Sequence, residues 1–280
     1  MSQTLVSNLA AIVSLVPSAA LVFRSAPARD GAFWAAVGVG IFGPCAWTAA
    51  QLAAGWNTDV SAALWITASV TMILFAVLAA WSRFGWRLVV LLAPYLLLLA
   101  VLAALWQTDR GRPFMATAPA AWLQLHIAVS VLAYGLLTLA SVAGLGVFLQ
   151  ERALKQKRQT KLSAMLPSVA DGEALQLSLL RAAAAGLAVG LLSGMATEYF
   201  EIGRILRLDH KTVFSLLTFA VIIGLLAANS RTGIRGRRAA RYVLFAYLLL
   251  TLAYPGVKFV TDVLIGEPQK TADCGSAACS

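Results

Sequence analysis

The sequence is poor in charge and very poor in histidine. Only 12% of its 280 residues are Asp, Glu, Lys or Arg, and only two are histidines. Soluble domains carry about 25% charged residues, so this composition excludes an ordinary water-soluble fold. Hydrophobic residues make up 60% of the chain and its mean hydropathy is +0.80. These values are typical of a protein that crosses a membrane several times.

Several chemical signatures are also absent. The sequence has no Cys-x-x-Cys-His, no Walker loop, no dinucleotide glycine fingerprint and no His-Glu-x-x-His, and so shows no residues for covalent c-type haem, ATP-driven or zinc-protease chemistry. Only three cysteines occur. We interpret Cys45 as a small buried hydrophobe. Cys274 and Cys279 are expected in a flexible tail, with a disulfide or a soft-metal pair as alternatives.

Long apolar runs follow one another along the chain. About 20 apolar residues are needed to cross the hydrocarbon layer as a helix, and membrane barrels show short alternating segments instead. We therefore predict an all-α, polytopic bundle of about eight transmembrane helices. The runs are 5–23, 32–54, 62–81, 86–106, 122–149, 177–197, 213–229 and 239–265. The first run lacks a positively charged n-region and is expected to remain as a helix.

No long linker separates these runs, so we expect one transmembrane domain over residues 1–280. Residues 1–121 would supply its first four helices and 122–265 its last four. An outer connector would lie near 198–211, and 266–280 would form the tail.

The basic residues predict the orientation. Lys and Arg concentrate in cytoplasmic loops, and 14 of the 22 fall in, or within three residues of, the connectors after the first, third, fifth and seventh runs. Both termini are therefore expected on the non-cytoplasmic side of a bacterial inner (cytoplasmic) membrane. Basic loops facing anionic lipid account for the net charge of +10, so no nucleic-acid partner is needed.

The two histidines are predicted to share one leaflet. His126 lies near the start of the fifth run and His210 just before the seventh, and both runs enter from the non-cytoplasmic side. Histidine is costly in hydrocarbon and faces a cavity or the bundle interior. Because neutral imidazole ligates haem iron, the pair points to a bis-histidine haem site with both side chains as metal ligands.

Hydroxyl side chains continue from His126 along the same predicted helix. Ser130, Tyr134, Thr138 and Ser141 follow at steps of four, four, four and three, which places them in one stripe. Lipid offers hydroxyl groups no partner, so the stripe is expected to face other helices. For Thr138 and Ser141 we favour a purely structural role.

The connector at 198–211 mixes apolar and charged residues, a pattern suited to a short interfacial helix. If it covers a haem, Arg204, Arg207 or Lys211 would pair with the propionates. An ordinary interfacial loop is the alternative. Tryptophans lie mostly near predicted helix ends and are assigned to the aromatic belt, except that Trp122, one turn before His126, is a candidate haem-pocket wall.

Specific stretches resemble a known family. These are "LQLHIAVSVLAYGLLTLASVAGLGVFLQERALKQK", "LPSVADGEALQLSLL", "LSGM", "DHKTVFSLLTFAV" and "GIRGRRAARYVLFAYLLLTLAYPGVKFV". Together they resemble the cytochrome c assembly membrane protein family, nearest its HemX/YpjD-like branch, with CcsA-like proteins more distant. The quoted stretches run from about residue 123 to 263.

The resemblance implies haem handling at the outer face of the membrane. In the synthase and exporter branches two outer histidines flank a tryptophan-rich segment, and His126 and His210 match the flanking positions. Here the segment contains no tryptophan, and no second histidine pair lies within the helices. The departures count against cytochrome c synthase activity and leave one haem site, or a family scaffold with an altered role.

Three functions follow as hypotheses. The first is a membrane protein that accepts, holds or delivers haem b for cytochrome maturation, with other membrane proteins or an apocytochrome as partners. The second is an electron-transfer subunit with one bis-histidine haem. The third is a cofactor-free scaffold or regulatory subunit of a membrane complex. A haem-handling or assembly role is favoured over that of a catalyst.

Overall fold

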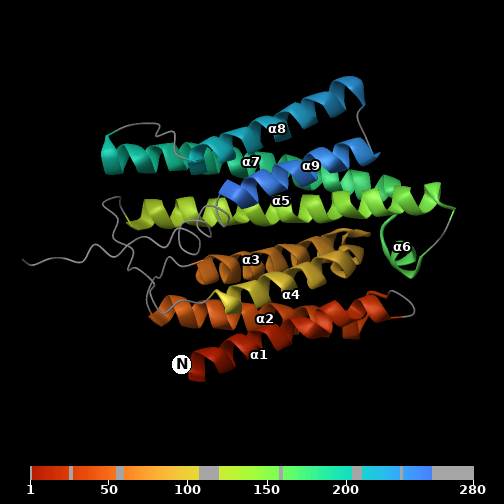
Figure 1. Ribbon diagram of the computed structural model, residues 1–280, viewed down its shortest axis with the longest axis horizontal. Helices are drawn as coiled ribbons and strands as arrows, with labels where there is room; N and C mark the ends of the chain where they lie inside the picture. The colour runs from red at the N-terminus through yellow and green to blue at the C-terminus, as the bar shows by residue number, and fades with distance from the viewer. Residues whose placement is uncertain are drawn as a thin grey trace, which may run out of the picture.

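The computed structural model describes residues 2–24, 28–54, 60–106, 120–157, 160–203, 210–233 and 236–253. Within these ranges every regular element is a helix and there is no strand, which confirms the predicted all-α bundle. Seven helical segments there are long and apolar enough to cross a membrane. They run side by side along the long axis of the molecule (Figure 1).

The helices follow the order of the apolar runs, but those of the fifth and sixth runs extend beyond them. In chain order they are α1 (Ser2–Ala20), η1 (Leu21–Phe23), α2 (Gly31–Ala54), α3 (Val60–Trp81), η2 (Gly85–Leu88), α4 (Val89–Leu105), α5 (Ala120–Lys155), α6 (Lys161–Met165), α7 (Val169–Ile202), α8 (His210–Thr232) and α9 (Gly236–Thr251). The short α6 was not predicted. It begins with a capping box between Thr160 and Ser163, which satisfies backbone N–H groups at its start. The remainder of the eighth predicted run, 254–265, lies outside the described residues.

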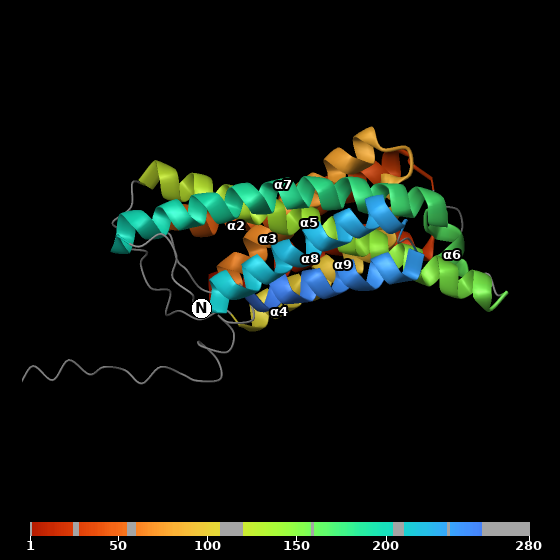
Figure 2. The ribbon, with the colours of Figure 1, turned by 90° about the horizontal axis from the view of Figure 1, so that it is seen from above.

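The helices form two groups joined along α5. The helices α1 to α4 pack together, and α5 packs against α3 on one side and against α7 and α9 on the other. Helix α8 covers the far side of α7 and α9. Figure 1 shows this order, with α7 and α9 between α5 and α8, and Figure 2, seen from above, shows α7, α8 and α9 in front of the other helices.

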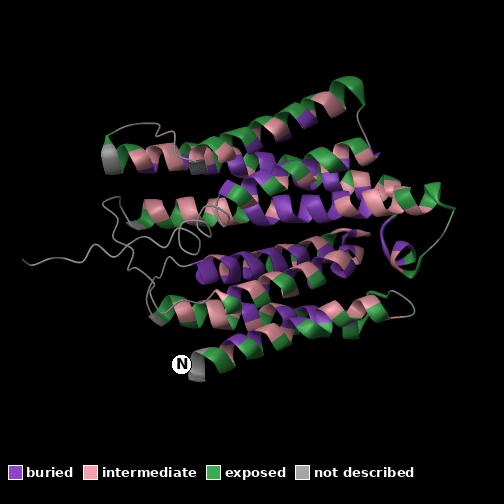
Figure 3. Cartoon of the chain, viewed as in Figure 1, coloured by how far each residue is buried: buried purple, intermediate pink, exposed green. Residues whose placement is uncertain are grey.

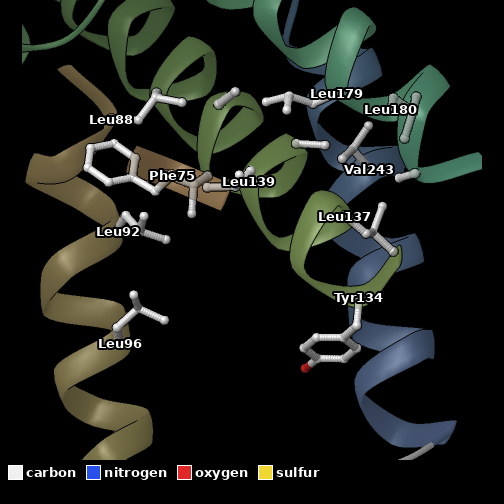
Figure 4. Packing of buried hydrophobic residues seen from close by; sticks show 14 of the residues in the cluster. Phe75, Leu88, Leu92, Leu96, Tyr134, Leu137, Leu139, Leu179, Leu180 and Val243 are labelled. Carbon is white, nitrogen blue, oxygen red and sulfur yellow. The ribbon is translucent and has the colours of Figure 1, made fainter. Parts of the chain in front are cut away.

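The core lies where α5 meets its neighbours. Burial is most continuous along α3 and the middle of α5, whereas α1, α2 and α8 expose long outward faces (Figure 3). Figure 4 shows Leu137 and Leu139 of α5 among side chains of α4, α7 and α9, including Leu92, Leu180 and Val243. The exposed outer faces are those that lipid would cover.

The prediction that the tryptophans form an aromatic belt is wrong for Trp65. Its side chain is fully buried and its indole N–H donates to Asn8 Oδ1 at 3.0 Å. A buried indole needs such an acceptor, so Trp65 belongs to the core between α1 and α3. Trp81, at the end of α3, is 88% exposed, in agreement with a belt position.

Three tyrosines connect the two groups of helices. The hydroxyl of Tyr247 on α9 is hydrogen-bonded to that of Tyr95 on α4, and it lies 3.3 Å from that of Tyr134 on α5. Tyr134 also bonds to Thr251 Oγ1 at 3.0 Å. Hydroxyl pairing of this kind holds transmembrane helices together, because lipid gives these groups no other partner.

The ends of the bundle agree with the charge pattern. The connections that follow α1, α3, α5 and α8 lie at one end, and the start of α1 lies at the other (Figure 1). The first end carries the basic connectors counted above. It is therefore the end that the positive-inside rule assigns to the cytoplasm.

Candidate functional site

The contact between α5 and α7 has a seam of glycines. Gly186, Gly190 and Gly194 recur every fourth residue of α7, so they share one face. A Cβ at position 186 would lie 3.2 Å from Ala133 Cβ, and one at position 190 would lie 3.6 Å from Ser130 Oγ. Small residues let helix backbones approach closely in membranes, and this seam brings α7 against the face of α5 that carries His126.

His126 is fixed by a hydrogen bond to α7. Its Nδ1 lies 2.8 Å from Ser193 Oγ. The single hydroxyl proton of Ser193 is donated to the carbonyl oxygen of Gly190, at 3.0 Å. Both contacts are hydrogen bonds only when Ser193 donates to Gly190 O and accepts from His126, and in that tautomer Nδ1 carries the proton and Nε2 keeps a lone pair. The ring's hydrogen bond to Ser193 is made through Nδ1 and not through Nε2.

This arrangement fits an axial haem ligand. Metal-binding histidines commonly donate one ring N–H to a protein acceptor while the other nitrogen binds the metal. Ser193 is 6% exposed and His126 is half-buried, so the acceptor is fixed in the helix contact while part of the imidazole remains accessible. The chemistry of His126 thus suits neutral imidazole ligation of iron.

Trp122 joins the same group of residues. Its indole N–H donates to the carbonyl oxygen of Ser193 at 3.3 Å, so two α5 side chains one turn apart reach one residue of α7. The Trp122 ring meets that of Phe200 edge-on, with centroids 6.5 Å apart. The proposed pocket-wall residue therefore lies beside the histidine, joined to it through Ser193.

Gly194 provides the space for the imidazole. A Cβ at this position would lie 3.0 Å from His126 Cε1 and 3.7 Å from Nε2. The ring therefore lies directly over the α7 backbone. With Ser193 beside it, Gly194 defines where the imidazole sits, and we call Trp122, His126, Ser193, Gly194 and Phe200 the outer α5–α7 site.

The outer connector differs in part from its prediction. Residues 198–202 continue α7 and do not start a separate interfacial helix. The helix ends because Gly203 adopts φ 69°, and its N–H bonds to Tyr199 O at 3.0 Å, a usual glycine C-cap. Tyr199 and Phe200 are each 56% exposed.

The second predicted ligand is placed only by its backbone. His210 and Lys211 are the first two residues of α8, and their side chains lie outside the described part of the structure. Arg204 and Arg207 also lie outside the described residues, as do Cys274 and Cys279. Because α5 and α8 both pack on α7 and α9, the two histidine-bearing helices flank the same pair.

Three of the four residues of the hydroxyl stripe of α5 are buried as predicted, and Ser130 is half-buried. Tyr134, Thr138 and Ser141 are at most 8% exposed. Thr138 Oγ1 donates to Tyr134 O at 2.9 Å and Ser141 Oγ to Leu137 O at 2.8 Å. These bonds within α5 support the structural role favoured for the two residues.

Ser193 and Gly194 were missed as site residues. The glycine spacing of four along α7 is a sequence signal for close helix contact. Nothing in the sequence pairs Ser193 with His126, because 67 residues separate them. Their pairing depends on the register between two helices.

Comparison with known proteins identifies the family and a relative of this chain. A family model described as "Cytochrome C assembly protein" matches residues 45–265, which extends the resemblance towards the N-terminus into α2. A protein of Azospirillum brasilense, described as "Uncharacterized 28.8 kDa protein in nifR3-like 5'region", is 51% identical over 271 residues. The match covers 95% of this chain and 100% of that protein. No solved structure matches.

Proposed function

The chain belongs to the cytochrome c assembly protein family, and from that premise we propose that it holds or delivers haem b at the outer α5–α7 site. Membership indicates a multi-pass membrane protein that handles haem in cytochrome c biogenesis. The haem type, the leaflet and the ligands are our proposal. A bacterial inner membrane is the proposed location, with an apocytochrome or another membrane protein as the recipient.

The observation that carries the proposal is the hydrogen-bond series from His126 through Ser193 to Gly190. It leaves the lone pair of His126 Nε2 available without any proton having to leave the ring. Bound haem would supply iron that accepts this lone pair. The protein positions the imidazole with Ser193 and Gly194, and Trp122 provides an aromatic wall beside it.

His210 is the proposed second axial ligand. Since α7 and α9 lie between α5 and α8 (Figure 1), an iron shared by the two histidines has to lie at the outer ends of these helices. His210 is the first residue of α8 and His126 the seventh of α5, so both are near those ends. Arg204, Arg207 and Lys211, close to His210 in sequence, are the proposed partners of the propionates.

The test is an absorption spectrum of the full-length protein, purified in mild detergent and supplied with haem b. We expect a low-spin spectrum in the wild type, and in the His126→Ala variant a high-spin spectrum or no bound pigment. A matched control is Tyr242→Phe on the exposed face of α9, where 52% of the residue is accessible. Wild-type protein without pigment, or His126→Ala with an unchanged spectrum, would reject the proposal.

A further inference from the structure

A second site is suggested at the opposite end of the bundle, where the α1–α2 and α3–α4 turns meet. These turns contain Arg24, Arg29, Arg83 and Arg87 but only one acid, Asp30. Arg24 donates to both carboxylate oxygens of Asp30, at 3.0 and 2.6 Å. This is the only salt bridge within the part of the chain that the structure describes. Three positive charges of this basic corner thus have no carboxylate partner there.

Arg87 has an unused donor. Its guanidinium lies 5.4 Å from the centroid of the Trp86 ring and donates from Nη1 to Leu166 O at 3.3 Å. Its Nε is buried and has no hydrogen-bond partner in the described structure. An N–H group buried without an acceptor is unfavourable, so a shift of the Arg87 guanidinium that brought Nε to an oxygen-bearing ligand would be favourable. A small, mainly apolar recess beside it is lined in part by Leu21, Arg24, Phe33, Trp86, Arg87 and Met165.

The neighbouring arginines are held by aromatic rings. Arg29 lies 5.3 Å from the ring centroid of Trp34 and donates to Ala80 O at 3.0 Å. Arg83 lies 5.5 Å from the ring centroid of Phe84. Stacking restricts each side chain and leaves guanidinium N–H groups for an anion, a geometry that suits phosphate oxygens.

We propose that this basic corner binds the phosphate group of an anionic phospholipid. The corner lies at the membrane boundary, because the candidate spans end at Phe23 and Trp81 and resume at Gly31 and Gly85. Phe23 and Trp81 are 87% and 88% exposed, and they offer apolar surface beside the arginines for the glycerol and upper acyl chains. Free phosphate would use the arginines but gain nothing from these rings, so the lipid is the favoured source.

Asp30 competes with that lipid. Hydrogen bonds from the Arg24 guanidinium hold the pKa of the Asp30 carboxyl well below its usual range, so Asp30 is an anion at neutral pH. It also accepts from the N–H of Phe33 at 2.9 Å and thereby caps α2. In an Asp30→Asn variant the amide oxygen retains this cap while the charge is removed, which frees Arg24 for the phosphate.

The experiment counts lipids on the delipidated, full-length protein by native mass spectrometry. The probes are dioleoylphosphatidylglycerol, zwitterionic dioleoylphosphatidylcholine and inorganic phosphate. We expect preferential binding of one phosphatidylglycerol. Binding should weaken about tenfold in Arg87→Lys, which keeps the charge but removes the buried Nε–H and the planar fork. The control Arg241→Lys, exposed on α9 and outside the basic corner, should stay near wild type, and Asp30→Asn should bind more tightly.

Three results would overturn the proposal. Unchanged binding in Arg87→Lys, which keeps the charge, would mean that only overall charge matters. Equal retention of the two lipids would remove the anion preference, and competition by inorganic phosphate at matched concentration would assign the site to free phosphate. Misfolding cannot explain the tighter binding expected of Asp30→Asn, since a poorly folded variant would not gain affinity for the lipid.

Discussion

The imidazole of His126 lies on the backbone of Gly194, across the contact between α5 and α7. Any side chain at position 194 would approach the ring, because a Cβ there would be 3.0 Å from Cε1. Gly194 therefore determines the position of His126 as directly as its hydrogen bond to Ser193 does. The two contacts come from consecutive residues of α7.

Replacing Gly194 should displace the histidine without unfolding the helix. We expect Gly194→Ala to bind haem b several-fold more weakly, since the ring must move by a few tenths of an ångström. Alanine is favoured over glycine in a helix by about 1 kcal/mol, so thermal stability should not fall in proportion. Gly224→Ala on α8 is the matched control, because a Cβ there meets nothing within 4 Å. Haem titration followed by absorbance measures both, and equal affinities would contradict the prediction.

Removing the hydroxyl of Ser193 should weaken the proposed ligand. In Ser193→Ala the Nδ1–H of His126 loses its acceptor, and the loss of such a partner costs roughly 10- to 100-fold in metal-site affinity or activity. We expect weaker haem binding and a higher iron midpoint potential, since a less basic imidazole stabilises the ferric state less. A redox titration measures the potential.

The control for that variant is Ser230→Ala on α8. Ser230 is exposed and bonds only within its own helix, to Leu226 O and Ala227 O. If Ser193→Ala and Ser230→Ala gave the same potential and affinity as the wild type, Ser193 would have no role in positioning His126. A purely structural role for Ser193 would change the melting temperature but leave the potential unchanged.

Hydropathy predicts the fold class because a helix satisfies its own backbone hydrogen bonds within lipid. Hydropathy predicts less well where each helix begins and ends. Helices α5 and α7 contain 36 and 34 residues, or about 54 and 51 Å at 1.5 Å per residue, and both exceed the ~30 Å hydrocarbon layer. Their ends carry charged residues that give no hydropathy signal. Hydropathy therefore does not predict the extension of α7 through residues 198–202.

For the site, His126 and Trp122 were predictable and Ser193 was not. The sequence alone shows a rare histidine near the start of an apolar run, and it also shows a tryptophan one turn before that histidine. The partner of that histidine depends on how α7 lies against α5, which is set by Ala133 and Ser130 packing on the glycines of α7. Those contacts join residues more than 50 positions apart, so periodicity within one helix does not reveal them.

The tyrosine cluster should contribute to stability and not to haem binding. Tyr247→Phe removes the hydroxyl that meets those of Tyr95 and Tyr134. Interhelical hydrogen bonds in membranes average about 0.6 kcal/mol, so we expect a loss of about 1 kcal/mol for the two contacts. Reversible unfolding in mixed micelles measures it, with Tyr242→Phe as the control on the same helix. A changed haem spectrum in Tyr247→Phe would show that the cluster belongs to the site after all.

The orientation is tested by labelling in intact cells with a membrane-impermeant maleimide. Lys157→Cys, placed in a background without native cysteines, should remain unlabelled because the basic connectors are expected in the cytoplasm. Cys274, as the only cysteine retained, should be labelled, since both termini are expected outside. Lysed cells serve as the control for reactivity. Labelling of residue 157 but not 274 in intact cells would reverse the orientation and place the outer α5–α7 site on the cytoplasmic side.

His210 provides the most demanding test, because the order of the helices constrains it. Helices α7 and α9 both lie against α5 and α8, so His126 and His210 can share one iron only at the outer ends of their helices. If they do, His210→Ala should convert a six-coordinate low-spin spectrum to a high-spin one, and the double variant with His126→Ala should lose the pigment. Asp209→Ala should weaken haem retention less than His210→Ala, because a neighbouring carboxylate acts only through a hydrogen bond or an arginine. If His210→Ala instead keeps the low-spin spectrum while His126→Ala loses it, iron ligation by His126 stands and the second axial ligand is another residue, since α8 then starts too far from α5 to reach the same iron.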